Sequence, residues 1–153
     1  MSQSIADYRP GRPFGDGSDG DLTISSNATW GTGTPTVPIQ PCSGTVGTTT
    51  LTINAADTFA NGDLILIHHS RGTTQNTGGW EVNRIVSGGG STTLTLADNL
   101  DYTYTDSGAD QSQVIKILEY DDVTLNGGVT WTIPTWGGNT GGIMVFAARG
   151  IVT

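Results

Sequence analysis

Apolar and polar residues alternate in short segments between residues 48 and 117, and Gly, Asn, Asp and Ser separate these segments. The segments are TTTLTINAADTFANGDLILIHHSRG, GWEVNRIVS, STTLTLADNL and SQVIKI. A period of two puts alternate side chains on one face of a strand, so each segment predicts a strand with one apolar face. The inward-facing pairs are Leu51 and Ile53, Leu94 and Leu96, and either Leu64 and Leu66 or Ile65 and Ile67.

The same pattern divides the chain into three parts. Residues 1–46 form an extended arm rich in Pro and Gly, with one short strand in DLTISSNATW, because each proline removes a backbone donor. Residues 47–118 form a small β-barrel. Residues 119–153 form a β-hairpin around the Asn126-Gly127 turn, a terminal apolar strand and the start of a solenoid. The predicted fold is all-β, a small barrel or sandwich with an extended N-terminal arm, a C-terminal hairpin and strand, and little or no helix.

Composition narrows the choice of partners. Only 13% of residues are charged and the formal net charge is -8. A negative field repels polyanions, so we expect no nucleic acid and no anionic membrane as partner. No apolar run approaches the ~18 to 20 residues of a membrane span. The single cysteine, Cys42, cannot form an internal disulfide, and nothing basic stands beside it, so we interpret it as a buried, inert small residue.

The segment GDGSDGD crowds carboxylates in the manner of a calcium loop. Asp16, Asp19 and Asp21 are its candidate ligands, but the glycine and glutamate positions of an EF-hand are not met. We therefore favour a turn that leads into the strand at Leu22, and predict no metal.

The two histidines end the LILIHH segment. In a strand His68 and His69 point to opposite faces and cannot both bind one metal ion. One alternative is a site where one of them meets its copies on the axis of a trimer; the simpler interpretation is a histidine at a strand end. The sequence contains no GxSxG motif, and its acids stand mostly in turn-like contexts. We predict no enzyme and no cofactor, with a polysaccharide depolymerase as the enzymatic alternative.

Aromatic side chains are the candidates for ligand binding. We select Trp131, Trp136, Tyr102 and Tyr104, since aromatic faces stack on sugar rings and anchor interfaces. The competing interpretation is that Trp131 and Trp80 fill space in the core of a protein with few large side chains.

Two groups of segments resemble bacteriophage proteins. FANGDLILIH followed by WEVNRIVSGGGSTTLTLADNLDYTYT is similar to a small β-barrel module of phage tail and baseplate proteins and of large bacterial surface proteins. FGDGSDGDLTISS and VTLNGGVTWTIPTWGGNTGGIMVFAARGIVT resemble the flanking segments in tail-fibre and tailspike proteins, where the second opens a longer β-solenoid. The resemblance implies that Phe59, Gly62 and Asp63 form a scaffold turn, and this chain departs from the pattern by stopping at Thr153.

These observations lead to one functional hypothesis and two rivals. We expect a structural component of a phage tail fibre or tail appendage, located in the virion, which forms a homotrimer and binds other tail proteins. The first rival is a glycan-binding adhesin module of a virion or cell surface, with a glycan receptor. The second is an extracellular filament subunit assembled by strand complementation, because the apolar final segment needs a neighbour.

Overall fold

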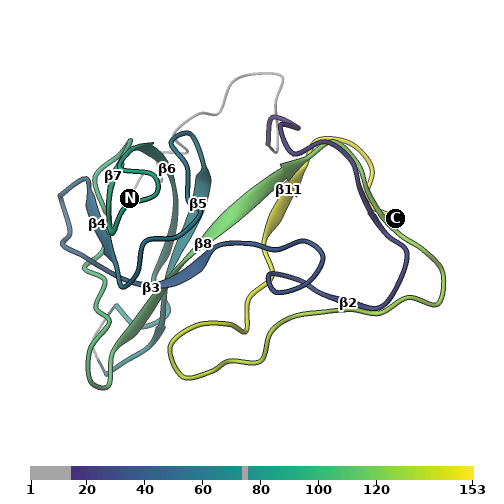
Figure 1. Ribbon diagram of the computed structural model, residues 1–153. Helices are drawn as coiled ribbons and strands as arrows, with labels where there is room; N and C mark the ends of the chain where they lie inside the picture. Colours follow the sequence, from purple (N-terminus) through teal and green to yellow (C-terminus); the bar gives the residue numbers. More distant parts are fainter. Residues whose placement is uncertain (1–14, 74–75) are drawn as a thin grey trace. The chain divides into compact units, whose positions relative to one another are not determined.

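The computed structural model describes residues 15–73 and 76–153. The regular secondary structure of these residues consists of β-strands alone (Figure 1). The prediction of an all-β chain is confirmed. The described residues contain no helix long and apolar enough to cross a membrane. The strands are β1 (Leu22–Ile24), β2 (Ala28–Thr29), β3 (Ile39–Gly44), β4 (Thr50–Ile53), β5 (Leu64–Arg71), β6 (Trp80–Ser87), β7 (Thr93–Leu96), β8 (Gln111–Tyr120), β9 (Val123–Leu125), β10 (Trp131–Thr132) and β11 (Phe146–Ala148).

The chain separates into two compact units. One unit, here called the barrel unit, comprises Pro38–Lys116 and Trp136–Gly141. The other, here called the rung unit, comprises the described residues of Met1–Val37, together with Ile117–Thr135 and Gly142–Thr153. Each is described by itself.

A closed barrel forms the first unit, as predicted. Its strand order is β3-β4-β7-β6-β5-β8, and β8 pairs with both β5 and β3, which closes the sheet on itself. Ile65 and Ile67 belong to the buried core, which decides the alternative left open by the LILIH pattern. The other predicted inward pairs also lie in this core: Leu51, Ile53, Leu94 and Leu96.

The barrel begins earlier than the sequence pattern suggested. β3 lies inside the segment predicted as an extended arm, yet it pairs antiparallel with β4 and with β8. The proline in this strand does not prevent pairing, because Pro41 keeps its carbonyl, which accepts a hydrogen bond from the Asn54 N–H at 3.3 Å. The first 14 residues of the predicted arm lie outside the described residues.

The rung unit is built from successive passes of the chain in parallel register. Leu22 pairs with Val123, and Val123 in turn pairs with Val152. Likewise β11 pairs with the end of β8, Phe146 opposite Leu118. The purple, green and yellow segments that run side by side in Figure 1 are these passes, which we call rungs. The apolar terminal segment therefore has a partner strand within its own chain.

The predicted hairpin is wrong in its pairing. The turn exists, since the Val129 N–H donates to the Asn126 carbonyl at 3.2 Å. However, the flanking strands do not pair with each other: β9 pairs with β1 and β10 pairs with β2, both in parallel. The segments that stack are similar in sequence: DLTISSNATW and DVTLNGGVTW have Asp, two Thr and Trp at the same positions. Each strand stacks on the segment that resembles it rather than on its neighbour in sequence.

Candidate functional site

Carboxylates connect the rungs of the rung unit. Asp19 Oδ2 accepts a hydrogen bond from the Glu119 N–H at 2.7 Å, and Asp21 Oδ1 accepts one from the Asp122 N–H at 3.2 Å. Asp122 Oδ1 repeats the arrangement one rung later, accepting from the Ile151 N–H at 2.7 Å. A charged acceptor strengthens a backbone hydrogen bond. These aspartates therefore link segments that are far apart in sequence.

The remaining member of the predicted calcium segment also bonds to backbone. Asp16 Oδ1 accepts from the Ser18 N–H at 2.9 Å, the geometry of an Asx turn. Arg149 donates to the Asp121 carboxylate and, at 3.2 Å, to the Asp16 carbonyl. Within residues 15–73 and 76–153, no three His, Cys, Asp or Glu side chains converge as metal ligands. Asp16, Asp19 and Asp21 thus serve turns and rungs in this structure.

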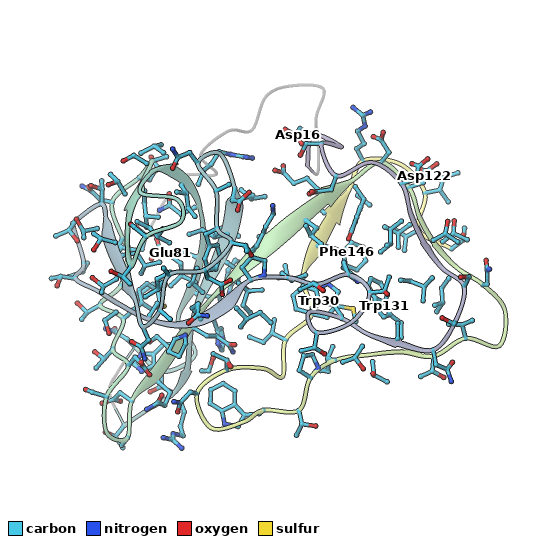
Figure 2. All side chains as sticks on the ribbon, viewed as in Figure 1. Asp16, Trp30, Glu81, Asp122, Trp131 and Phe146 are labelled. Carbon is cyan, nitrogen blue, oxygen red and sulfur yellow. The ribbon has the colours of Figure 1, made fainter. Side chains whose placement is uncertain are left out.

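The aromatic candidates fall in both units. Trp131, in the rung unit, donates from Nε1 to the Thr34 carbonyl at 3.0 Å, and its ring centroid lies 5.6 Å from that of Phe146 (Figure 2). Trp136 belongs to the barrel unit and is half-buried. The structure therefore places these two tryptophans in different units.

The tyrosines of the barrel unit do meet. Tyr102 and Tyr104 form an edge-to-face pair with centroids 6.3 Å apart. Tyr104 is buried in the core, whereas Tyr102 is 37% exposed, so only Tyr102 offers a surface to a ligand. Trp80 was expected to pack in the core, but it is 50% exposed at the start of β6, where its side chain points outward.

One end of the barrel interior holds polar groups. Glu81 is buried and accepts two hydrogen bonds from the Asp101 N–H, at 3.1 and 3.3 Å. Burial raises the pKa of Glu81, and burial together with the Glu81 charge raises the pKa of Tyr104. Cys42 is fully buried, and this burial raises the pKa of its thiol well above the ordinary value. A thiol that stays protonated is a poor nucleophile, which fits the inert role predicted for Cys42.

A hydrogen-bonded chain crosses the outer face of β5 and β8. His68 Nδ1 lies 2.8 Å from Ser70 Oγ, which accepts from Gln113 Nε2 at 2.8 Å. The Gln113 amide then holds both backbone groups of Gly141: it donates to the carbonyl at 3.1 Å and accepts from the N–H at 2.9 Å. Burial, with a smaller effect of His69, lowers the pKa of His68, which favours the neutral imidazole that can accept from Ser70. Sequence analysis missed Gln113, because nothing in SQVIKI marks this glutamine as different from a surface residue.

The turn before β5 contains Phe59, Gly62 and Asp63. Phe59 is buried in the barrel core, and Gly62 has a φ of 98°, a conformation that favours glycine. Asp63 Oδ2 accepts from the Ala60 N–H at 2.8 Å, and Asp63 Oδ1 lies 2.9 Å from Lys116 Nζ. The carboxylate therefore ties this turn to β8.

A shallow groove lies on the rung unit between β2, β10 and the loop that follows β2. Its volume is about 560 Å³ and its lining carries no charge. The Thr29 and Thr132 hydroxyls on the two strands are 3.1 Å apart. The lining residues are Asn27, Ala28, Thr29, Thr32, Gly33, Thr34, Thr130 and Thr132.

No protein-family model matches the chain, and no curated protein matches it at a significant level.

Proposed function

We propose that this chain is a structural component of a bacteriophage tail fibre or related tail appendage. In this proposal it acts by mechanical stability and subunit assembly, not by catalysis. The barrel unit and the rung unit would be rigid building blocks, and the partners would be copies of the same chain, as a homotrimer, and other tail proteins.

The main support for the proposal is that the carboxylates accept hydrogen bonds from backbone N–H groups. In a catalytic or metal site, carboxylates converge and leave oxygen atoms facing a ligand. Here Asp19, Asp21 and Asp122 accept backbone N–H groups of the next rung, and Glu81 and Asp63 do the same for turns of the barrel. Carboxylates that bind backbone N–H groups favour a rigid structural role over a catalytic one. A load-carrying protein requires such rigidity. The phage context comes from two resemblances: the barrel segments resemble a module of phage tail and baseplate proteins and of large bacterial surface proteins, and the flanking segments resemble tail-fibre and tailspike proteins.

Exposed apolar residues on the last rung, which contains Ile151 and Val152, support an assembly role. Ile151 is 65% exposed and Val152 is 59% exposed, although both lie on a rung whose other edge is hydrogen-bonded. Exposed apolar side chains beside an open strand edge favour pairing with another chain. A substitution to Lys at Val152 would place a charge in such an interface.

The test is the oligomeric state of the chain. Size-exclusion chromatography with light scattering is expected to give a stable trimer for the natural sequence and a smaller species for Val152→Lys. The matched control is Val86→Lys, because Val86 is also exposed, at 52%, but lies on the barrel. A monomer at all concentrations in the natural sequence would contradict the proposal.

A second candidate is a glycan-binding module, favoured by the uncharged groove on the rung unit. A volume of about 560 Å³ lies within the range of small-molecule sites, and hydroxyl and amide groups suit a neutral sugar. A glycan array with the full chain would detect such binding. Loss of signal in Thr132→Val, with Trp136→Ala unaffected, would assign it to the groove, whereas the reverse result would assign it to Trp136.

A further inference from the structure

His69 is a buried histidine of the barrel unit. It is 1% exposed, and neither of its ring nitrogens makes a hydrogen bond to residues 15–73 or 76–153. Its Nε2 lies 3.7 Å from Asp110 Oδ1, which is longer than a hydrogen bond. A buried polar group without a partner is costly, and a bound ligand would remove that cost.

Three polar atoms of described residues converge over Gly72, which itself has no side chain to fill the space between them. A Cβ atom added to Gly72 would lie 2.3 Å from Asp110 Oδ1, 2.7 Å from His69 Nε2 and 2.9 Å from Thr77 Oγ1. Any larger residue at this position would push these atoms apart. Glycine therefore keeps a small cradle open between the end of β5 and the segment before β8.

The carboxylate in this cradle is held in place and reachable. Asp110 Oδ1 accepts from the Thr73 N–H at 3.0 Å, and the neighbouring Ala109 carbonyl accepts from Arg71 Nε at 3.2 Å. Hydrogen bonds of this kind orient metal-binding carboxylates. The Asp110 side chain is 20% exposed, so this carboxylate is in contact with solvent.

We propose that His69 and Asp110, with Thr77 Oγ1 beside them, form a binding site for a divalent transition-metal ion of the zinc type. Zinc binds imidazole nitrogen at ~2.0 to 2.1 Å and carboxylate oxygen at ~2.0 to 2.2 Å. Two ligand atoms 3.7 Å apart can both reach an ion at those distances. An imidazole ligand selects zinc, cobalt or nickel over magnesium and calcium. Water completes the coordination, and with two ligands from His and Asp the affinity is lower than that of a four-ligand structural site.

The adjacent histidine provides a matched control. His68 points to the opposite face of β5, where its Nδ1 contacts Ser70 Oγ. It is a histidine in the same strand, with the same intrinsic metal affinity, but it does not face the cradle. Its removal should leave binding unchanged.

The experiment is a titration of the full, tag-free chain with Zn²⁺ by calorimetry and with Co²⁺ by visible absorption. One ion per chain is expected for the natural sequence and for His68→Gln. Binding should weaken at least about tenfold in His69→Gln and Asp110→Asn, with circular dichroism used to select folded variants. Gly72→Ala should also weaken binding, because its methyl group fills the cradle. The proposal is overturned if the natural chain shows no saturable binding, or if folded Asp110→Asn or His69→Gln binds like the natural chain.

Discussion

The buried amide of Gln113 provides a sharp test of how the barrel unit holds its outlying segment. Gln113 is fully buried on β8 and makes two hydrogen bonds to the backbone of Gly141, at 2.9 and 3.1 Å. These two bonds join residues 136–141 to strand β8. Replacing Gln113 by Leu keeps the volume and removes the hydrogen bonds.

The expected loss follows from the groups left behind. A buried backbone donor or acceptor without a partner costs ~1 to 3 kcal/mol. Gln113→Leu leaves two such groups on Gly141, which is itself buried, so we expect a loss of about 3 kcal/mol in the free energy of unfolding. For a chain of this size each kcal/mol lowers Tm by ~2 to 4 °C, which gives a fall of about 6 to 12 °C.

The control is Gln111→Leu in the same strand. Gln111 is also buried, but its amide makes one hydrogen bond, to the Gly108 carbonyl at 3.3 Å. Urea denaturation should show a clearly smaller loss, about 1 kcal/mol. Hydrogen exchange at the Gly141 amide should accelerate in Gln113→Leu and remain slow in Gln111→Leu. Equal losses in the two variants, with an unchanged Gly141 exchange rate, would refute the reasoning.

Three further predictions concern other parts of the chain. Asp122→Ala should destabilise the rung unit by about 1 kcal/mol in urea, which is less than the ~1.5 to 3 kcal/mol of a charged hydrogen bond because Asp122 is exposed. Asp122→Asn retains an acceptor for the Ile151 N–H and should lose less, and equal losses would count against a role of Asp122 in linking the rungs. Cys42 should resist thiol reagents at pH 8 in the native chain and react once urea unfolds it, because burial raises its pKa; rapid native labelling would contradict this. A fragment of residues 38–116 should fold by itself, since its ends meet through the Lys116 N–H and the Pro38 carbonyl at 3.1 Å, and a random-coil circular dichroism spectrum would disprove it.

The sequence was sufficient to predict the barrel because its signals are local. Alternation in TLTIN and TLTLA identifies Leu51 and Leu94 as inward residues, and both lie in the core. The same parity correctly separates His68 from His69 on opposite faces of β5. Period two is a property of a single strand, so it needs no knowledge of which strands are neighbours.

The rung unit could not be predicted in the same way, because the aspartate-to-backbone hydrogen bonds between its rungs join segments that are 29 to 101 residues apart in sequence. Asn126-Gly127 is a strong hairpin signal, but such a signal describes the turn and not the partner of the strands beside it. The likeness between residues 21–30 and 122–131 would have indicated stacking. It is imperfect as a guide, since β10 aligns Trp131 with Ala28 and not with Trp30. The proximity of Asp110 to His69 and the bonds between Gln113 and Gly141 were missed for the same reason, because each joins distant segments.

A closed barrel explains how the rungs keep their register across the long insertion between the first and the second. Antiparallel closure leaves the barrel no free strand edge to compete for pairing with the rungs. Its first and last strands, β3 and β8, pair with each other, so the chain enters and leaves the barrel at neighbouring points, joined by the hydrogen bond between Pro38 and Lys116. The cost of closing a loop grows slowly with its length, and a folded insertion with adjacent ends acts as a short one. The insertion therefore leaves Leu22 able to pair with Val123 in parallel, as Val123 pairs with Val152.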